Sequence, residues 1–182
     1  MNNTKYFSYI GNAYPHKNLD RLVKAMSLLN KNKNEKVILK ISSSRNIFTA
    51  RLQDMIANNN AQEFVELLGY VPDNEINEFL KKSVAFVFPT LAEGFGIPPM
   101  EAIVAGTIVV QSDIPVLKEI YEDTTLYFNP LDVKDMVRVM EEALKMSELE
   151  RQKRIKYAQN FLKKYSWKKM AEETVKIYES VK

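Results

Sequence analysis

The sequence predicts an α/β domain with a parallel sheet that is covered by helices on both faces. Short, nearly continuous apolar runs alternate along the whole chain with segments whose apolar residues recur at helical spacing. Glycine, proline, serine and asparagine turns separate the two kinds of segment. With 182 residues, of which 46% are hydrophobic, the chain is long enough for one domain with a substantial core.

The apolar runs predict six strands, and polar or glycine-containing turns follow the first four. Because ligands of parallel sheets bind beyond the carboxyl ends of the strands, we expect these four turns to converge on one crevice. The turns cover residues 11–17, 42–45, 69–72 and 90–97. The predicted strands are Tyr6–Ile10, Val37–Ile41, Phe64–Leu68, Val84–Phe88, Thr107–Val110 and Leu126–Phe128.

The helices are predicted from their apolar faces and from the polar residues that precede them. In chain order, one starts after the expected cap Asn18, one spans roughly 47–58, one is capped by Asp73, one starts near Pro98 and one spans 115–121. From Asp132 the chain is predicted to be helical: Asp132 caps one helix, a second covers about 148–164, and Ser166 caps a third. The last helix carries Trp167, Met170, Thr174, Ile177 and Tyr178 on one side.

Composition excludes several classes of protein and site. There are no cysteines and one histidine, so disulfides, thiolate chemistry and a zinc site are not expected. A net charge of +3 gives no argument for nucleic acid as a partner. The first residues contain no signal-peptide apolar region, and the longest apolar run, 102–110, is half the length of a membrane span. These features favour a cytoplasmic location.

The segment from Glu93 to Glu101 is the strongest candidate for a binding site. It follows an apolar strand, contains Gly94 and Gly96, and leads into a helix, so backbone N–H groups can approach a ligand closely. The helix start favours an anion such as a phosphate, and the two carboxylates can accept hydrogen bonds from hydroxyl groups. This combination suits a phosphorylated sugar or nucleotide. By spacing alone, a simple turn with solvated or capping glutamates explains the segment equally well.

Several such segments taken together are more specific than any one of them. They resemble the C-terminal, donor-binding domain of the large retaining glycosyltransferase family 4, which has the two-domain GT-B fold. The resemblance implies a Rossmann-like sheet of about six strands with additional C-terminal helices, forming a single donor-binding domain over residues 1–182. It also implies that the N-terminal acceptor domain of the family is absent from this chain. The segments that carry the resemblance are Gly11–Leu19, Leu68–Asp73, Pro89–Glu101, Ala105–Val110 with Pro115, and Tyr165–Trp167.

The resemblance also assigns roles to residues. Lys17 would neutralise the diphosphate and assist its departure, and Glu93 would contact the transferred sugar, so these two are the candidate catalytic residues. Glu101 would accept hydrogen bonds from the ribose, and no metal or other cofactor would be required. The full set of candidate donor-binding residues is Gly11, Asn12, Lys17, Gly69, Tyr70, Val71, Thr90, Glu93, Gly94, Phe95, Gly96, Ile97 and Glu101.

One position departs from the family pattern. The family commonly has an arginine after the glycine of the first loop, whereas this chain has Asn12, which cannot offset phosphate charge. Arg45 is a candidate for a compensating cation. Without the resemblance, Lys17 would be interpreted as a solvated lysine before a helix, and His16 is interpreted as a partly exposed turn residue.

The resemblance implies the donor half of an enzyme that moves a hexose from a nucleotide sugar to an acceptor glycan or lipid-linked glycan in polysaccharide biosynthesis. The chain alone is expected to bind the donor without useful transfer, because the acceptor belongs to the other domain. The final helices of the family cross onto that domain, so their apolar sides are expected to be exposed here. The alternatives are a non-catalytic nucleotide-sugar-binding or regulatory module and half of a nucleotide-sugar epimerase.

The segment from Lys145 to Lys169 is basic, with nine lysines or arginines against two glutamates. A solvated helix surface explains this charge. The alternative is peripheral contact with an anionic membrane that carries a lipid-linked acceptor.

Overall fold

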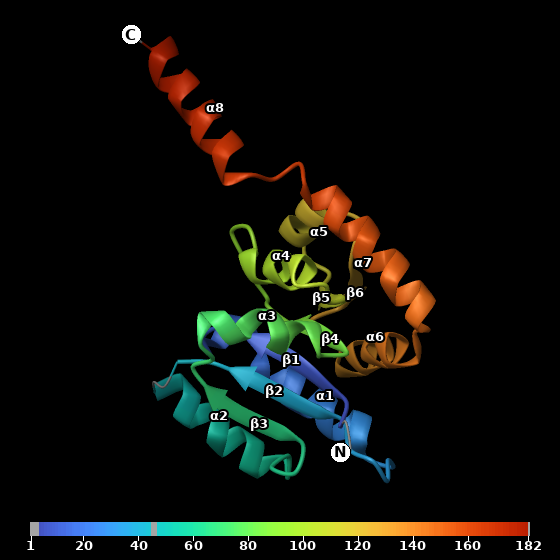
Figure 1. Ribbon diagram of the computed structural model, residues 1–182. Helices are drawn as coiled ribbons and strands as arrows, with labels where there is room; N and C mark the ends of the chain where they lie inside the picture. The colour runs from blue at the N-terminus through green and yellow to red at the C-terminus, as the bar shows by residue number, and fades with distance from the viewer. Residues whose placement is uncertain (1–3, 45–46, 182) are drawn as a thin grey trace.

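A computed structural model describes residues 4–44 and 47–181, and in them six parallel strands form one sheet. The strand order is β3-β2-β1-β4-β5-β6 (Figure 1). Consecutive strands are therefore neighbours except for β3 and β4, because β4 pairs with β1 and the direction of strand addition reverses there. The predicted fold class is confirmed. The strands are β1 (Tyr6–Ile10), β2 (Ile38–Ser42), β3 (Val65–Gly69), β4 (Ala85–Phe88), β5 (Val109–Ser112) and β6 (Leu126–Phe128).

Two of the six strands have the predicted bounds, β4 starts one residue late, and β2 and β3 are shifted by one residue at both ends, but β5 starts and ends two residues later than predicted. Thr107 was predicted as the first residue of this strand but belongs to the turn before it. Its N–H donates to the carbonyl of Ala102, and its hydroxyl donates to the carbonyl of Leu80. At the other end, Gln111 and Ser112 are polar but fully buried, and they pair with Tyr127 and Phe128 of β6. Sequence polarity was thus a poor guide to the end of this strand.

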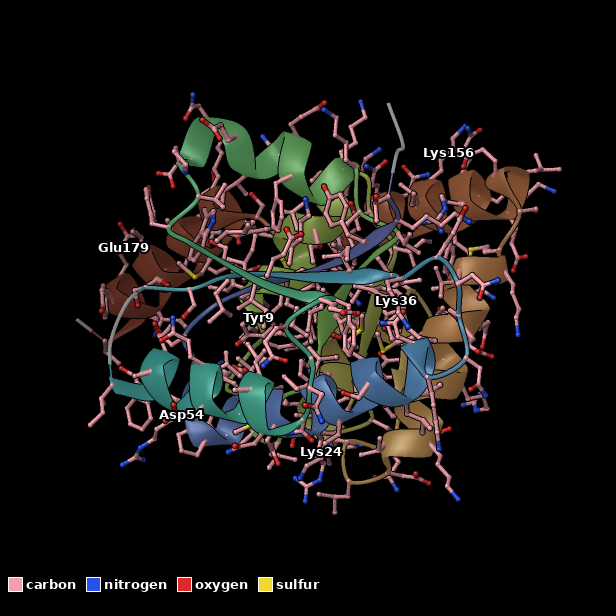
Figure 2. All side chains as sticks on the ribbon, turned by 90° about the horizontal axis from the view of Figure 1, so that it is seen from below. Tyr9, Lys24, Lys36, Asp54, Lys156 and Glu179 are labelled. Carbon is pink, nitrogen blue, oxygen red and sulfur yellow. The ribbon has the colours of Figure 1, made fainter. Side chains whose placement is uncertain are left out.

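Helices cover both faces of the sheet. Figure 2 shows α3 on one side and both α1 and α2 on the other. Helix α6 packs on α1, while α4 packs on α3 and on α7, so each face has its own layer. The helices of these layers are α1 (Leu19–Asn30), α2 (Ile47–Asn58), α3 (Asp73–Lys81), α4 (Ile97–Val104), α5 (Pro115–Tyr121), α6 (Val133–Lys145) and α7 (Glu148–Leu162), with a short 3-10 turn η1 (Pro15–Lys17) before α1.

Two of the four predicted helix caps are confirmed and two are wrong. The side chains of Asp132 and Ser166 accept hydrogen bonds from backbone N–H groups at the starts of α6 and of α8 (Trp167–Ser180). Asn18 does precede α1, but its side chain makes no capping bond and is used elsewhere. Asp73 is the first residue of α3 rather than its cap, which is Pro72. The Asp73 carboxylate therefore lies in the first turn of α3, where the helix dipole favours negative charge.

Helix α8 stands apart from the two layers. Figure 1 shows it projecting from the end of α7, away from the rest of the molecule. None of its residues is buried, and the large apolar ones are among the most exposed in the described chain. The expectation of an exposed apolar side on the last helix is confirmed. Among the described helices, none has the length and apolar character needed to cross a membrane.

Candidate functional site

The candidate site lies where the order of the sheet reverses. β1 and β4 are adjacent and parallel, and the loops that follow them leave the same edge of the sheet in opposite directions. Such a switch point leaves a crevice between the two loops. The loops are also bonded to each other, because the N–H of Leu91 donates to the carbonyl of His16 at 2.7 Å. Residues 11–18 and 89–96 therefore form one connected structure, as predicted.

Lys17 and Glu93 meet at this crevice. Lys17 Nζ lies 2.5 Å from Glu93 Oε1, and their side chains are only 17% and 13% exposed. The ammonium also lies 5.4 Å from the centroid of the Phe88 ring. Sequence reasoning assigned the two side chains to different parts of a ligand but did not foresee that they pair. Because a partly buried charged group needs a partner, the contact holds both side chains in a fixed orientation.

Asn18 explains how the first loop is held. It is buried and has a left-handed backbone with φ 58°, a conformation that asparagine tolerates better than most residues. Its Nδ2 donates to the carbonyls of Pro89 and Pro130, both at 2.9 Å. This residue therefore ties the loop after β1 to the loop after β4 and to the start of the α6 region. The expected capping role is replaced by this bridging role.

The beginning of the first loop depends on Gly11. Its φ is +145°, and a Cβ there would lie 3.0 Å from Tyr9 Oη, so a side chain would displace the tyrosine. Tyr9 is fully buried and donates to the carbonyl of Asn12 at 2.9 Å. Burial, with a further contribution from the charge of Glu93, raises the pKa of Tyr9, so the phenol stays neutral beneath the ion pair. The Asn12 side chain is exposed and accepts from Ser44 Oγ, while Arg45 lies outside the described residues.

The loop between β4 and α4 presents unpaired backbone donors. Within the described chain, the N–H groups of Gly94, Phe95 and Gly96 have no hydrogen-bond acceptor. Pro98 and Pro99 follow in the first turn of α4 and have no N–H, so the donors are concentrated in the loop. An anion placed over the loop would satisfy them.

Gly96 shapes this loop. Its φ is +83°, and a Cβ would lie 2.7 Å from Leu117 Cδ2, so glycine is required for both conformation and space. Its carbonyl accepts a hydrogen bond from the buried Tyr121 hydroxyl. Gly94, in contrast, has open space around the position of a Cβ, which leaves room for a ligand.

Glu101 lies in α4, one turn after the loop, as predicted. Burial, and then the negative charge of Asp73 at the start of α3, raise the pKa of its carboxyl group. The turn before α3 contains Gly69, with φ +73°, and Tyr70, whose ring is 71% exposed and whose hydroxyl donates to Asp73 at 3.1 Å. A hollow of about 470 Å³ opens beside Gly69, between α2 and the ends of β2 and β3.

The remaining predicted residues divide into supporting and accessible ones. Thr90 is fully buried, and its hydroxyl bonds to the carbonyls of His16 and Ala92, so it holds the loops in place. Val71 is buried, whereas Phe95, in the loop after β4, and Ile97, the first residue of α4, are exposed. His16 is exposed, as predicted, and contributes its carbonyl rather than its ring. Among the described residues, no group of three or more histidine, cysteine, aspartate or glutamate side chains is arranged to hold a metal ion.

Sequence reasoning missed Asn18, Tyr9 and Tyr121 as supports of the site. Asn18 stands next to Lys17, and a polar residue at the start of a helix has capping as its ordinary interpretation. Tyr9 was predicted only as part of the first strand, and Tyr121 only as the end of the short helix 115–121. A long-range hydrogen bond from a buried tyrosine to a loop carbonyl has no local sequence signal.

Comparisons with known proteins identify the family of the chain. The model of the family described as glycosyl transferases group 1 matches residues 2–161. The O-antigen chain mannosyltransferase RfbU of Salmonella typhimurium is 36% identical over 129 residues, which are 71% of this chain and 35% of that protein. The chain thus spans about a third of the length of the curated relatives it matches first.

Solved structures show the same fold. The α,α-trehalose 6-phosphate synthase of Burkholderia multivorans superposes with a TM-score of 0.88 at 17% identity, covering 98% of this chain and 43% of that one. A TarM variant from S. aureus, in complex with UDP and two sugar ligands, has a TM-score of 0.83 at 21% identity over 97% of this chain and 36% of its own. The family match over most of the chain decides the assignment: this chain belongs to the glycosyl transferases group 1 family.

Proposed function

We propose that this chain is the donor-binding domain of a retaining glycosyltransferase that moves a hexose from a nucleoside diphosphate sugar to an acceptor glycan. The observation that carries the proposal is the partly buried Lys17–Glu93 pair at the switch point, next to three unpaired backbone N–H groups. A cation and several free donors suit a diphosphate, and a carboxylate at the same place suits sugar hydroxyls. The names of two relatives, both O-antigen chain mannosyltransferases, favour mannose as the hexose.

Each residue has a definite task in this proposal. The bond between the anomeric carbon and the diphosphate oxygen breaks, and the charge that develops on the diphosphate is stabilised by Lys17 and by the N–H groups of Gly94, Phe95 and Gly96. Glu93 accepts from hydroxyls of the sugar and keeps Lys17 oriented. Glu101 accepts from the ribose diol, close to the turn at Gly69. In this scheme the protein supplies the positive charge, and no metal ion is needed.

The whole reaction needs more than this domain. The acceptor would be held by the remainder of the protein, and the exposed side of α8 would pack against that part. Positioning of donor and acceptor in a closed cleft supplies much of the rate of such reactions. We therefore expect the 182-residue chain to bind the nucleotide weakly and to transfer little sugar by itself.

Calorimetry with a nucleoside diphosphate and the matching bare nucleoside tests the site. Lys17→Ala should weaken diphosphate binding by about tenfold or more and nucleoside binding much less, because a charge-assisted bond is lost. Lys24→Ala is the matched control, since Lys24 is an exposed lysine of α1 whose partner is Asp20. Equal effects of the two substitutions, or none, would place the phosphates elsewhere.

Glu101→Ala should weaken binding of both ligands by about tenfold, because each carries the ribose. Asn12→Arg should tighten diphosphate binding, most clearly at low salt. If Asn12→Arg has no effect while Lys17→Ala does, the first loop does not reach both phosphates.

Transfer itself is tested with the acceptor-binding part added, fused or in trans. Retention of the donor's anomeric configuration and turnover in EDTA are expected. Binding without any transfer under these conditions would favour a non-catalytic binding module, and a changed sugar with no transfer would favour an epimerase. Loss of turnover in EDTA would contradict the metal-free scheme.

We also propose peripheral contact with an anionic membrane through the basic side of α7. A groove of about 910 Å³ lies at the sheet edge opposite the candidate site. Arg151 is one of its lining residues; its guanidinium donates to the carbonyls of Val84 and Ala143, and burial lowers its pKa. The charged residues that line the groove are Lys5, Lys81, Lys82, Arg151 and Lys156, with Glu148 as the acidic one.

Sedimentation with vesicles tests this contact. Binding should require anionic lipid and should fade with salt. Lys156→Glu should reduce it, whereas Lys24→Glu should have little effect, because the two lysines lie on opposite sides of the sheet (Figure 2). Equal partitioning onto neutral and anionic vesicles would show that the basic segment is an ordinary solvated surface.

A further inference from the structure

We propose that Tyr165 is a positioning residue for the loop of residues 94–96 and that it connects this loop to the link between α7 and α8. The inference rests on the proposed function, since the loop is assigned to the donor diphosphate. Tyr165 does not touch the reacting atoms in this scheme. It acts by supporting Phe95, whose backbone N–H is one of the unpaired donors.

The contact is a ring against a ring. The centroids of Phe95 and Tyr165 lie 5.5 Å apart with an interplanar angle of 86°, the edge-to-face arrangement that aromatic pairs favour. Phe95 is 40% exposed, so it is not held by the core. Within the described residues, this is the one ring contact of Phe95, and an exposed side chain depends strongly on such a neighbour.

Tyr165 is itself well anchored. Its hydroxyl donates to the carbonyl of Ile120 at 3.3 Å, and its N–H donates to the carbonyl of Leu162 at 2.9 Å. Lys164 adds a second tie, because its Nζ lies 3.0 Å from Glu122 Oε1 and 5.2 Å from the centroid of the Tyr165 ring. The end of α7 is thus fastened to the end of α5.

The same end of α5 supports the loop at the next residue. Tyr121, the last residue of α5, donates to the carbonyl of Gly96. Two tyrosines therefore support successive loop residues, Phe95 through Tyr165 and Gly96 through Tyr121. Tyr121 is fully buried in the core, whereas Tyr165 belongs to the short link directly before α8.

This difference has a functional consequence. A change in the direction of α8 must be absorbed between the end of α7 at Leu162 and the start of α8 at Trp167. Tyr165 lies inside that interval and contacts the loop, so a change in this link that moves the Tyr165 ring changes how the loop presents its N–H groups. The link should therefore affect diphosphate binding without touching the diphosphate.

Two substitutions at Tyr165 separate this role from simple stability. Tyr165→Phe keeps the ring and loses one long hydrogen bond, so diphosphate affinity should stay close to that of the unaltered chain. Tyr165→Leu removes the ring and should weaken diphosphate binding about three- to tenfold, with nucleoside binding unchanged. Tyr157→Leu is the matched control, because Tyr157 is an exposed tyrosine of α7 that bonds to Asp123.

A double-mutant cycle tests whether the two rings act together. If Phe95 and Tyr165 form one unit, Phe95→Leu combined with Tyr165→Leu should weaken diphosphate binding no more than either single change. Independent losses that multiply, an unchanged affinity of Tyr165→Leu, or an equal loss for nucleoside and diphosphate would each overturn the positioning role.

Hydrogen exchange keeps the test separate from the proposed function. If the unaltered chain binds no nucleoside diphosphate, the proposed function fails, but the support of the loop is still measurable. Tyr165→Leu should then speed amide exchange at residues 95 and 96 while Tyr165→Phe leaves it unchanged. Unchanged exchange in Tyr165→Leu would overturn the inference.

Discussion

Helices α1 and α8 have similar lengths and an apolar side each, but the rest of the molecule treats them differently. α1 has twelve residues, of which seven are buried; it covers one face of the sheet (Figure 2) and packs on α6 and α2. α8 has fourteen residues, and none is buried. An amphipathic pattern therefore predicts that a helix has a side to bury, but it does not identify the surface that buries it. For α1 that surface is the adjacent sheet, and for α8 it is absent from the described residues.

The largest expected effect comes from one substitution in each helix. Leu22 is fully buried, so Leu22→Ala should lower the free energy of unfolding by about 2–5 kcal/mol. Ile177 is 63% exposed, so Ile177→Ala should change it by less than about 0.5 kcal/mol. Urea unfolding followed by circular dichroism measures both. Similar losses for the two variants would mean that α8 packs in solution, for instance against a second copy.

A smaller effect is expected at the residues that begin the two helices. Asn18→Ala leaves the carbonyls of Pro89 and Pro130 without their donor and should lower the free energy of unfolding by about 1–3 kcal/mol. Ser166→Ala removes a capping bond to the N–H of Lys169. It should speed amide exchange in the first turn of α8 and leave the urea midpoint unchanged. A shifted midpoint for Ser166→Ala would couple α8 to the global transition.

The smallest expected effect concerns Glu101, the exposed counterpart of the paired Glu93. Its pKa is raised in the folded protein, so the folded state holds the proton more tightly than the unfolded state does. Ionisation of Glu101 therefore lowers the free energy of unfolding as the pH rises through the pKa of the folded protein. Below the pKa of the unfolded chain, Glu101 is protonated in both states and has no such effect. Glu101→Gln should raise the melting temperature by about 1 °C or less at neutral pH, with the difference disappearing below about pH 4. A difference that grows in acid would contradict this sign.

Much of the fold was predictable because local pattern and final structure agree. Strands β1 and β6 and helices α2 and α5 have the predicted bounds, since turn residues or a proline mark where these segments begin or end. The crevice was predictable for a similar reason, because carboxyl ends of parallel strands share an edge. The pairing of Lys17 with Glu93 was harder to predict. Lys17 was assigned to the diphosphate and Glu93 to the sugar. The two side chains meet because β1 and β4 are neighbours in the sheet.

The errors arise where a polar residue bonds to a distant part of the chain. Asn18 was expected to serve its own helix, yet its amide reaches a carbonyl 112 residues away. Gln111 and Ser112 were left out of β5 because they are polar, although the sheet buries both completely. Local propensity describes what a residue does with its nearest neighbours, and these residues are used by the tertiary structure instead.

The ion pair at the switch point also has a consequence for folding kinetics. Its two residues are separated by 76 positions, and they meet only after β1 and β4 have paired. The chain between them forms β2 and β3 on the other side of β1, so that half of the sheet can assemble without completing the crevice. Contacts of such long sequence separation form late and slowly. Nucleotide binding during refolding should therefore lag behind the recovery of helical signal, and it would report completion of the sheet.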